Sequence, residues 1–81
     1  MRFLIEADRQ MTVVFEPTAE EFRLSAGETI VVEWFAESED GMVSMEAGMF
    51  IVSAPRGGYT RAWRGDGTEI YIGPESGSEA S

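Results

Sequence analysis

The chain has 81 residues, of which 43% are apolar, a formal net charge of −9, and neither Cys nor His. This length limits it to one domain with a thin core, and the missing Cys and His exclude disulfides and ordinary zinc, haem and iron–sulfur sites. The charge is unevenly placed, because residues 1–46 hold eleven acids and three arginines, whereas residues 47–81 hold four acids and three arginines. We therefore expect surfaces that meet partners of different character.

The apolar stretches are short. The first, Phe3 to Ile5, is far shorter than the roughly 7–15 residues of a signal peptide. No stretch reaches the roughly 18–20 apolar residues of a membrane span. The sequence thus predicts a soluble cytoplasmic protein with no membrane partner.

Apolar and polar residues alternate with period two along most of the chain, which is the pattern of β-strands. The first two runs cover Phe3 to Ala7 and Met11 to Phe15. Pro17 ends the second run, because proline has no N–H to donate to a strand ladder.

Residues 18–26 fit two structures. The spacing Thr18-Ala19-Glu20-Glu21 matches a helical capping box. The alternation of Phe22 and Leu24 with charged neighbours instead favours a strand followed by a turn at Gly27. We prefer the strand and keep the short helix as the alternative.

The strongest strand pattern runs from Thr29 to Glu37. Apolar groups lie on both of its faces, so we expect a central strand with one face in the core and the other partly covered. Asp40-Gly41 then supplies the positive φ that tight hairpins need. Later strands are expected over 43–47, 49–52, 59–64 and 68–72, separated by turns rich in glycine.

These elements predict an all-β domain over residues 1–72, a small single-domain antiparallel β-barrel or β-sandwich of about six to eight short strands. Residues 73–81 lack apolar periodicity and are expected to form a disordered tail. The run Phe15-Glu16-Pro17, continued from Phe22 to Trp34, is similar to the strand–turn–strand near the start of cupredoxin-like sandwiches. The copper ligands of that family include His and Cys, so the resemblance implies a sandwich or barrel without the copper function.

Catalysis is not expected. Without His, Cys or Lys, the chemistry would depend on Ser, Tyr or paired carboxylates. Glu20/Glu21 and Glu39/Asp40 are poor pairs, because adjacent strand residues point to opposite faces and turn residues face solvent. The acidic turn 37–41 also fails the pattern of a calcium loop. No catalytic, metal or cofactor site is therefore predicted.

Two groups of residues are candidate partner-binding sites. The acidic group comprises Glu33, Glu37, Glu39, Asp40 and Glu46. The Arg-aromatic group comprises Arg56, Tyr59, Arg61, Trp63 and Arg64. Within the second group, Tyr59, Arg61 and Trp63 share one strand face, which forms an outer platform for stacking if the opposite face is in the core. In the alternative interpretation, Tyr59 and Trp63 are core residues and Arg61 pairs with a carboxylate or lies along apolar surface.

Three methionines, Met42, Met45 and Met49, fall within eight residues. Methionine fills gaps in cores and also suits adaptable binding surfaces. The binding interpretation requires these side chains to be exposed.

The leading functional expectation is a non-catalytic acidic protein that binds a basic protein partner, as an inhibitor docked on a surface that otherwise holds nucleic acid. One alternative is a subunit of a homo-oligomer that buries Phe35, Tyr59, Trp63 and Tyr71. Another is a small-ligand or carbohydrate-binding module that uses the Arg-aromatic platform. Direct nucleic-acid binding is not expected, since a net charge of −9 repels phosphate.

Overall fold

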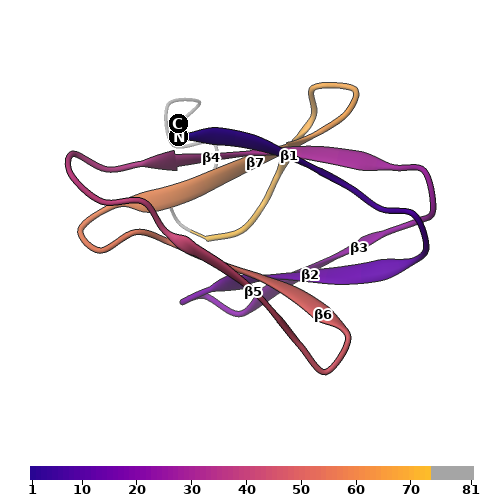
Figure 1. The fold of residues 1–81 in the computed structure, drawn as a ribbon. Helices are drawn as coiled ribbons and strands as arrows, with labels where there is room; N and C mark the ends of the chain where they lie inside the picture. Colours follow the sequence, from indigo (N-terminus) through magenta and orange to yellow (C-terminus); the bar gives the residue numbers. More distant parts are fainter. Residues whose placement is uncertain (74–81) are drawn as a thin grey trace.

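The computed structural model describes residues 1–73, which form eight strands and no helix. The strands are β1 (Arg2–Glu6), β2 (Met11–Glu16), β3 (Glu20–Leu24), β4 (Thr29–Phe35), β5 (Met42–Glu46), β6 (Met49–Ser53), β7 (Tyr59–Arg64) and β8 (Glu69–Ile70). They make two four-stranded sheets, ordered β1-β4-β7-β8 and β3-β2-β6-β5, which lie one above the other (Figure 1). The all-β prediction is confirmed, and the arrangement is an open sandwich. The predicted tail, apart from Gly73, lies outside the described residues.

One strand pair departs from the expected antiparallel pairing. β2 and β6 run parallel, with Val13 opposite Phe50 and Phe15 opposite Val52, while the other five pairs are antiparallel. β6 forms a hairpin with β5 on one edge, so its other edge is free to receive β2. Period-two alternation is the same for both strand directions, so it does not reveal this pairing.

The core lies between the two sheets, and β4 is central to its sheet as predicted. Ile30, Val32 and Trp34 on β4 are buried, while the residues between them are half-buried. The neighbours of β4 are β1 and β7. The remaining buried apolar core residues are Ile5, Ala7, Val13, Phe15, Leu24, Val52, Ala62, Ile70 and Ile72.

The segment 18–26 is a strand rather than a short helix. Residues 20–24 form β3, which pairs with β2 and places Leu24 in the core. The ladder with β2 satisfies the backbone groups that a helix would satisfy internally. The last predicted strand is shorter than expected, because β8 covers only Glu69–Ile70. Beyond it, the Thr18 hydroxyl donates a 2.7 Å hydrogen bond to the carbonyl of Ile72.

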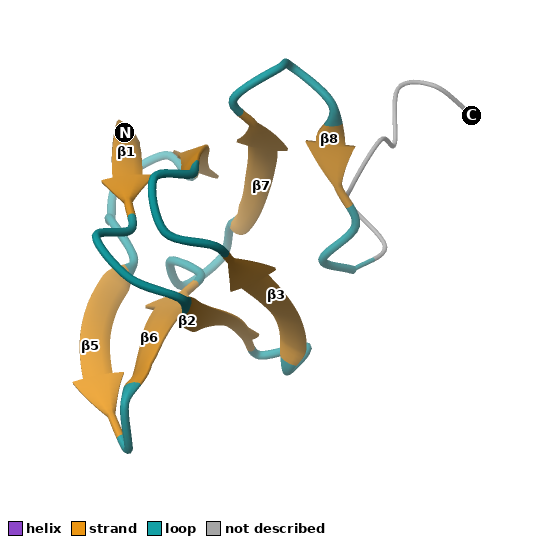
Figure 2. Ribbon diagram, turned by 90° about the vertical axis from the view of Figure 1, so that its right-hand side faces the viewer, coloured by secondary structure: helices purple, strands orange, loops and turns teal. Residues whose placement is uncertain are grey.

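The two open sides of the sandwich differ. Edge strands β3 and β8 lie on one side, and β1 and β5 on the other (Figure 2). On the β3 side, the Arg64 guanidinium lies 4.6 Å from the centroid of the Phe22 ring and covers it. On the other side the edges of β1 and β5 frame a groove, described next.

Candidate functional site

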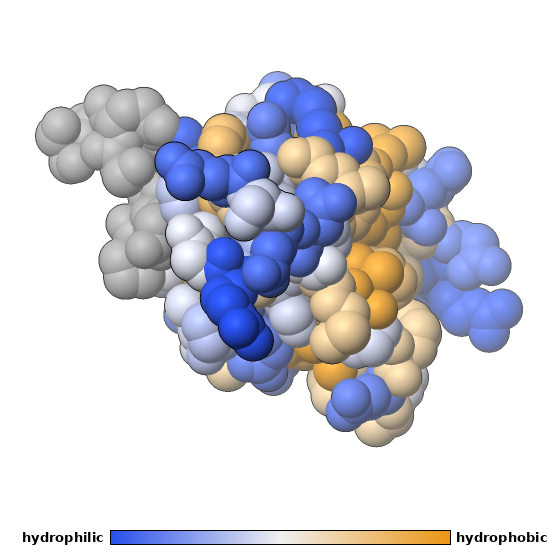
Figure 3. Space-filling view, turned by 60° about the vertical axis from the view of Figure 1, so that its left-hand side comes forward, coloured by the Kyte–Doolittle hydropathy of each residue, from blue (hydrophilic) through white to orange (hydrophobic). Residues whose placement is uncertain are grey.

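The side of the sandwich between β1 and β5, here called the β1/β5 flank, exposes most of the large apolar side chains. Of the six large apolar residues that are exposed within residues 1–73, five lie on β1, on β5 or directly before β1: Met1, Leu4, Met42, Val43 and Met45. Their exposed fractions run from 44% for Val43 to 63% for Met42. Figure 3 shows apolar surface gathered along one side of the molecule. Clustering of this kind indicates an interaction surface.

A groove of about 450 Å³ follows this flank. Its lining includes Met1, Phe3, Leu4, Trp34, Val43 and Phe50. Trp34 is itself 7% exposed, and its ring packs against Phe3 with 4.8 Å between the ring centroids. The indole Nε1 of Trp34 is buried with no hydrogen-bond partner among the described residues. The packed rings of Phe3 and Trp34 therefore form an aromatic wall of the groove.

The groove exists because β5 presents core-type side chains where no strand covers them. Val43 is opposite Val52 and Met45 is opposite Phe50, so both share a sheet face with core residues. Val43 and Met45 are nevertheless 44% and 59% exposed, and β5 is an edge strand of its sheet. Val43 and Met45 are therefore apolar residues on the inner face that remain accessible to a partner.

Carboxylates surround the apolar surface. Six exposed acids lie at the ends of the flank: Glu6, Asp8, Glu37, Glu39, Asp40 and Glu46. Glu6 lines the groove itself, and Glu46 ends β5. Of the nearby arginines, Arg9 lies 3.5 Å from Asp8, and Arg2 turns to the outer sheet face. The rim of the flank is thus acidic.

The predicted acidic group is not gathered on one face. Glu37, Glu39 and Asp40 lie together in the β4–β5 connection. Glu46 lies at the other end of β5, about 13 Å from the first residue of the strand at the usual rise per residue. These four residues border the β1/β5 flank. Glu33 does not, because it lies on the outer face of its sheet and accepts a 3.0 Å hydrogen bond from Arg2 Nη1.

Three residues of the Arg-aromatic group form the predicted outer platform. Thr60 and Ala62 are buried, so Tyr59, Arg61 and Trp63 point to the outer face, and the interpretation of Tyr59 and Trp63 as core residues is wrong. The Arg61 guanidinium lies 5.3 Å from the Trp63 ring centroid.

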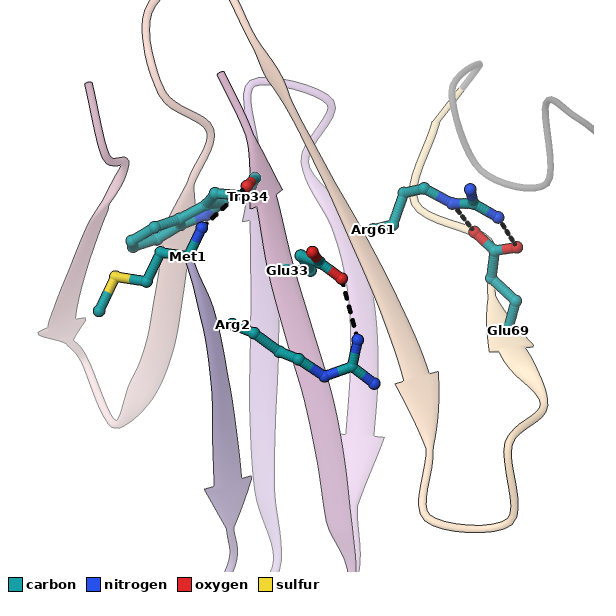
Figure 4. Close-up of polar contacts among 6 residues, drawn as sticks. All are labelled: Met1, Arg2, Glu33, Trp34, Arg61 and Glu69. Carbon is teal, nitrogen blue, oxygen red and sulfur yellow. Dashed lines mark hydrogen bonds and ion pairs between the residues drawn. The ribbon is translucent and has the colours of Figure 1, made fainter. Parts of the chain in front are cut away.

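The charges of this outer face are paired with one another. Arg61 binds Glu69 and Arg2 binds Glu33 (Figure 4). The rings of Phe35 and Tyr59 stack at 5.0 Å. Two cations and two acids cancel here, so the platform presents less charge to a partner than its arginines suggest.

Arg64 and Arg56 do not join the platform. Arg64 covers Phe22 on the opposite side of the sandwich. Arg56 is exposed in the β6–β7 connection, where it lines a hollow of about 460 Å³ together with Glu37 and Tyr59. The predicted Arg-aromatic group is therefore divided among three places.

Two of the three clustered methionines meet the condition for the binding interpretation. Met42 and Met45 are 63% and 59% exposed, while Met49 is half-buried. Flexible thioether side chains adapt to different partner surfaces. The sequence did not indicate that Phe50 would lie opposite Met45, or that Leu4 and Trp34 would line a groove with Val43. The sequence feature that could have indicated this surface was the low charge of residues 42–45.

Residues 1–73 contain neither a cluster of metal-ligating side chains nor a membrane-spanning helix. No three or more acidic, His or Cys side chains lie close enough there to hold a metal ion, and that part of the chain forms no helix capable of spanning a membrane. In the β7–β8 turn, the backbone N–H of Thr68 lowers the pKa of Asp66. That carboxylate organises a turn.

Comparisons of the chain with protein-family models, with curated proteins and with solved structures find no match. The β1/β5 flank, where apolar surface and acidic rim coincide, is therefore the basis for assigning a function.

Proposed function

We propose that this protein is a non-catalytic binding module that captures a basic segment of a partner protein on the β1/β5 flank. The observation that carries the proposal is that five of the six exposed large apolar residues described lie on this one flank, within a rim of exposed carboxylates. Apolar burial provides the attraction at the centre. The rim selects cationic partners and speeds their encounter.

The free energies involved require both apolar burial and ion pairing with the rim. Full burial of a Val, Leu or Met side chain contributes about 1.5–3 kcal/mol, so covering the half-exposed side chains of Met1, Leu4, Val43 and Met45 contributes about 3–6 kcal/mol. Association costs an estimated 4–15 kcal/mol in lost freedom of motion. Apolar contact alone therefore binds weakly, and partner cations that pair with the rim must add to it. A neutral apolar segment is expected to bind less well than a basic one.

Basic segments with apolar residues are common on nucleic-acid-binding surfaces, where Arg and Lys hold phosphates. Carboxylates on the rim are suited to the same cations. The acidic charge therefore favours one specific form of the proposed function, in which the module inhibits a nucleic-acid-binding surface. In that case, nucleic acid should compete with the module for its partner.

A displayed library of random ten-residue peptides tests the proposal. We expect peptides selected on the wild-type protein to be enriched in Arg and Lys together with apolar residues, and to lose affinity as salt concentration rises. The selected peptides should bind the Met45→Glu variant at least ten-fold more weakly. Tyr71→Glu is the matched control, because Tyr71 is the exposed apolar residue outside the flank, at 65% exposure, and the change in charge is the same.

Selection of peptides without a basic bias would overturn the proposal. Equal loss of binding in Met45→Glu and Tyr71→Glu would do so too, since the loss would then not depend on the flank.

A further inference from the structure

We infer that the partner segment binds as an added β-strand on the free edge of β5, in an extended conformation that alternates apolar and basic residues. This inference rests on the proposed function and specifies its binding mode and ligand class.

Among the four edge strands, β5 has the least protection against pairing. Natural edge strands carry charges, prolines or bulges that prevent addition of another strand. β1 carries Arg2 and Glu6, and β3 carries three charges in five residues. β8 has only two residues, one of them Glu69. β5 has the sequence Met-Val-Ser-Met-Glu, with its single charge at the last position.

The backbone of β5 is aligned for strand addition at Val43 and Met45. Ala47 and Gly48 connect β5 to β6 with φ values of 51° and 78°, and positive φ at both central residues is typical of a two-residue type I′ hairpin. Such a turn makes Glu46 and Met49 a hydrogen-bonded pair, and hydrogen-bonded pairs recur at every second residue. Ser44 therefore bonds to β6, and the N–H and C=O groups of Val43 and Met45 point to the free edge.

The side chains around this edge define the ligand. Residues opposite Val43 and Met45 would place their side chains in the groove, where Phe50 and Trp34 offer apolar surface. Residues between them would point to the other face, where β5 presents Met42, Ser44 and Glu46, with Asp40 shortly before the strand. Apolar residues suit the first set of positions and cations the second. A segment of about five or six alternating residues matches the length of β5.

A second copy of this chain is a poor occupant of the same edge. Each copy has a net charge of −9, and pairing two β5 strands would bring their acidic rims together. Like charges placed opposite each other destabilise a strand pair. Charge complementarity therefore selects a basic segment.

Hydrogen exchange provides the test. The probe is a capped six-residue peptide of alternating Arg and Val, added to the full chain. We expect its binding to slow amide exchange at Val43 and Met45 at least ten-fold. The amide of Leu4 is the internal control. Met1 exchanges backbone hydrogen bonds with Trp34, so by alternation the Leu4 N–H points to the free edge of β1.

Two modified peptides test backbone pairing directly. N-methylation of the Val residues removes the donors of an antiparallel added strand, and N-methylation of the Arg residues removes those of a parallel one. We expect the Val-methylated peptide to lose binding and the Arg-methylated peptide to retain it; the reverse result would also support strand addition, with parallel direction. Tolerance of both modifications overturns it.

The outcomes separate the two proposals. Binding of the peptide without new protection at Val43 and Met45 overturns strand addition and leaves the proposed function standing. Protection at these amides that rises with protein concentration, without peptide, identifies a second copy as the occupant and also overturns it. Failure of the library selection to favour basic peptides overturns the proposed function itself.

Discussion

Arg61 and Glu69 face each other across β7 and β8 as a bidentate ion pair. Arg61 Nε lies 2.8 Å from Glu69 Oε2, and Arg61 Nη2 lies 2.7 Å from Glu69 Oε1. The two side chains are only 12% and 19% exposed, so solvent weakens the attraction less than at an open surface. This pair joins the two-residue strand β8 to its sheet.

Removal of the cation should destabilise the fold. We expect Arg61→Met to lower the free energy of unfolding by about 2–3 kcal/mol, because a largely buried carboxylate loses a charged, hydrogen-bonded partner. Urea denaturation measures the change. The control is Arg2→Met, whose ion pair with Glu33 leaves the Arg2 side chain 64% exposed and should matter by less than about 1 kcal/mol. Equal losses in the two variants would contradict the role of burial.

Gly41 should tolerate no side chain. A Cβ on Gly41 would lie 2.7 Å from Trp34 Cε2 and would also clash with the backbone carbonyl of Ser53. We expect Gly41→Ala to destabilise the protein by about 1–3 kcal/mol, as overpacking does, and to change the fluorescence of Trp34.

Gly65→Ala is the matched control for Gly41→Ala. Its nearest contact would be 3.1 Å, to the Thr29 hydroxyl, so a smaller loss of stability is expected. If the two variants were equally stable, the close packing of Gly41 on Trp34 would not limit the fold.

The hydroxyl of Thr18 should stabilise the end of the described chain. It lies 2.7 Å from the carbonyl oxygen of Ile72, 54 residues away in sequence. Thr18→Val keeps the shape and removes the donor, and we expect a loss of about 1 kcal/mol in unfolding free energy. Thr12→Val is the control, because Thr12 lies on the outer face of β2 and a β-branched apolar residue suits a strand. A Thr18→Val variant as stable as Thr12→Val would refute this role.

Asp66 should make stability depend on pH in the acid range. The backbone N–H of Thr68 and then its side chain lower the pKa of Asp66 below the usual value of 3.8. Since the folded pKa lies below that of the unfolded chain, about 3.9, the stabilisation is complete above the unfolded pKa and is lost as the pH falls through the folded pKa. Carboxyl NMR titration measures the pKa, and the pH-dependent stability difference between wild type and Asp66→Ala should shrink in acid. An Asp66 pKa of 3.8 or higher would contradict this prediction.

The sequence by itself predicted most of the strands and the inner face of β4. The tight hairpin predicted at Asp40-Gly41 is wrong, because β4 and β5 lie in different sheets and Gly41 does not have a positive φ. Ile30, Val32 and Trp34 alternate with more polar neighbours, and period two places them on one face wherever the strand pairs. For β7 the sequence allowed two interpretations, with either Thr60 and Ala62 or Tyr59 and Trp63 facing the core. The burial of Thr60 and Ala62 decided between them. Local sequence patterns predict which residues share a strand face, because alternation depends on neighbouring residues alone.

Only the tertiary structure decided which strands form edges, and with that the candidate site. Val43 and Met45 alternate as core residues do, yet they are exposed because no strand pairs with the outer edge of β5 within residues 1–73. The parallel pairing of β2 with β6 belongs likewise to strand order. Strand order depends on contacts between residues far apart in sequence, which period-two alternation does not encode.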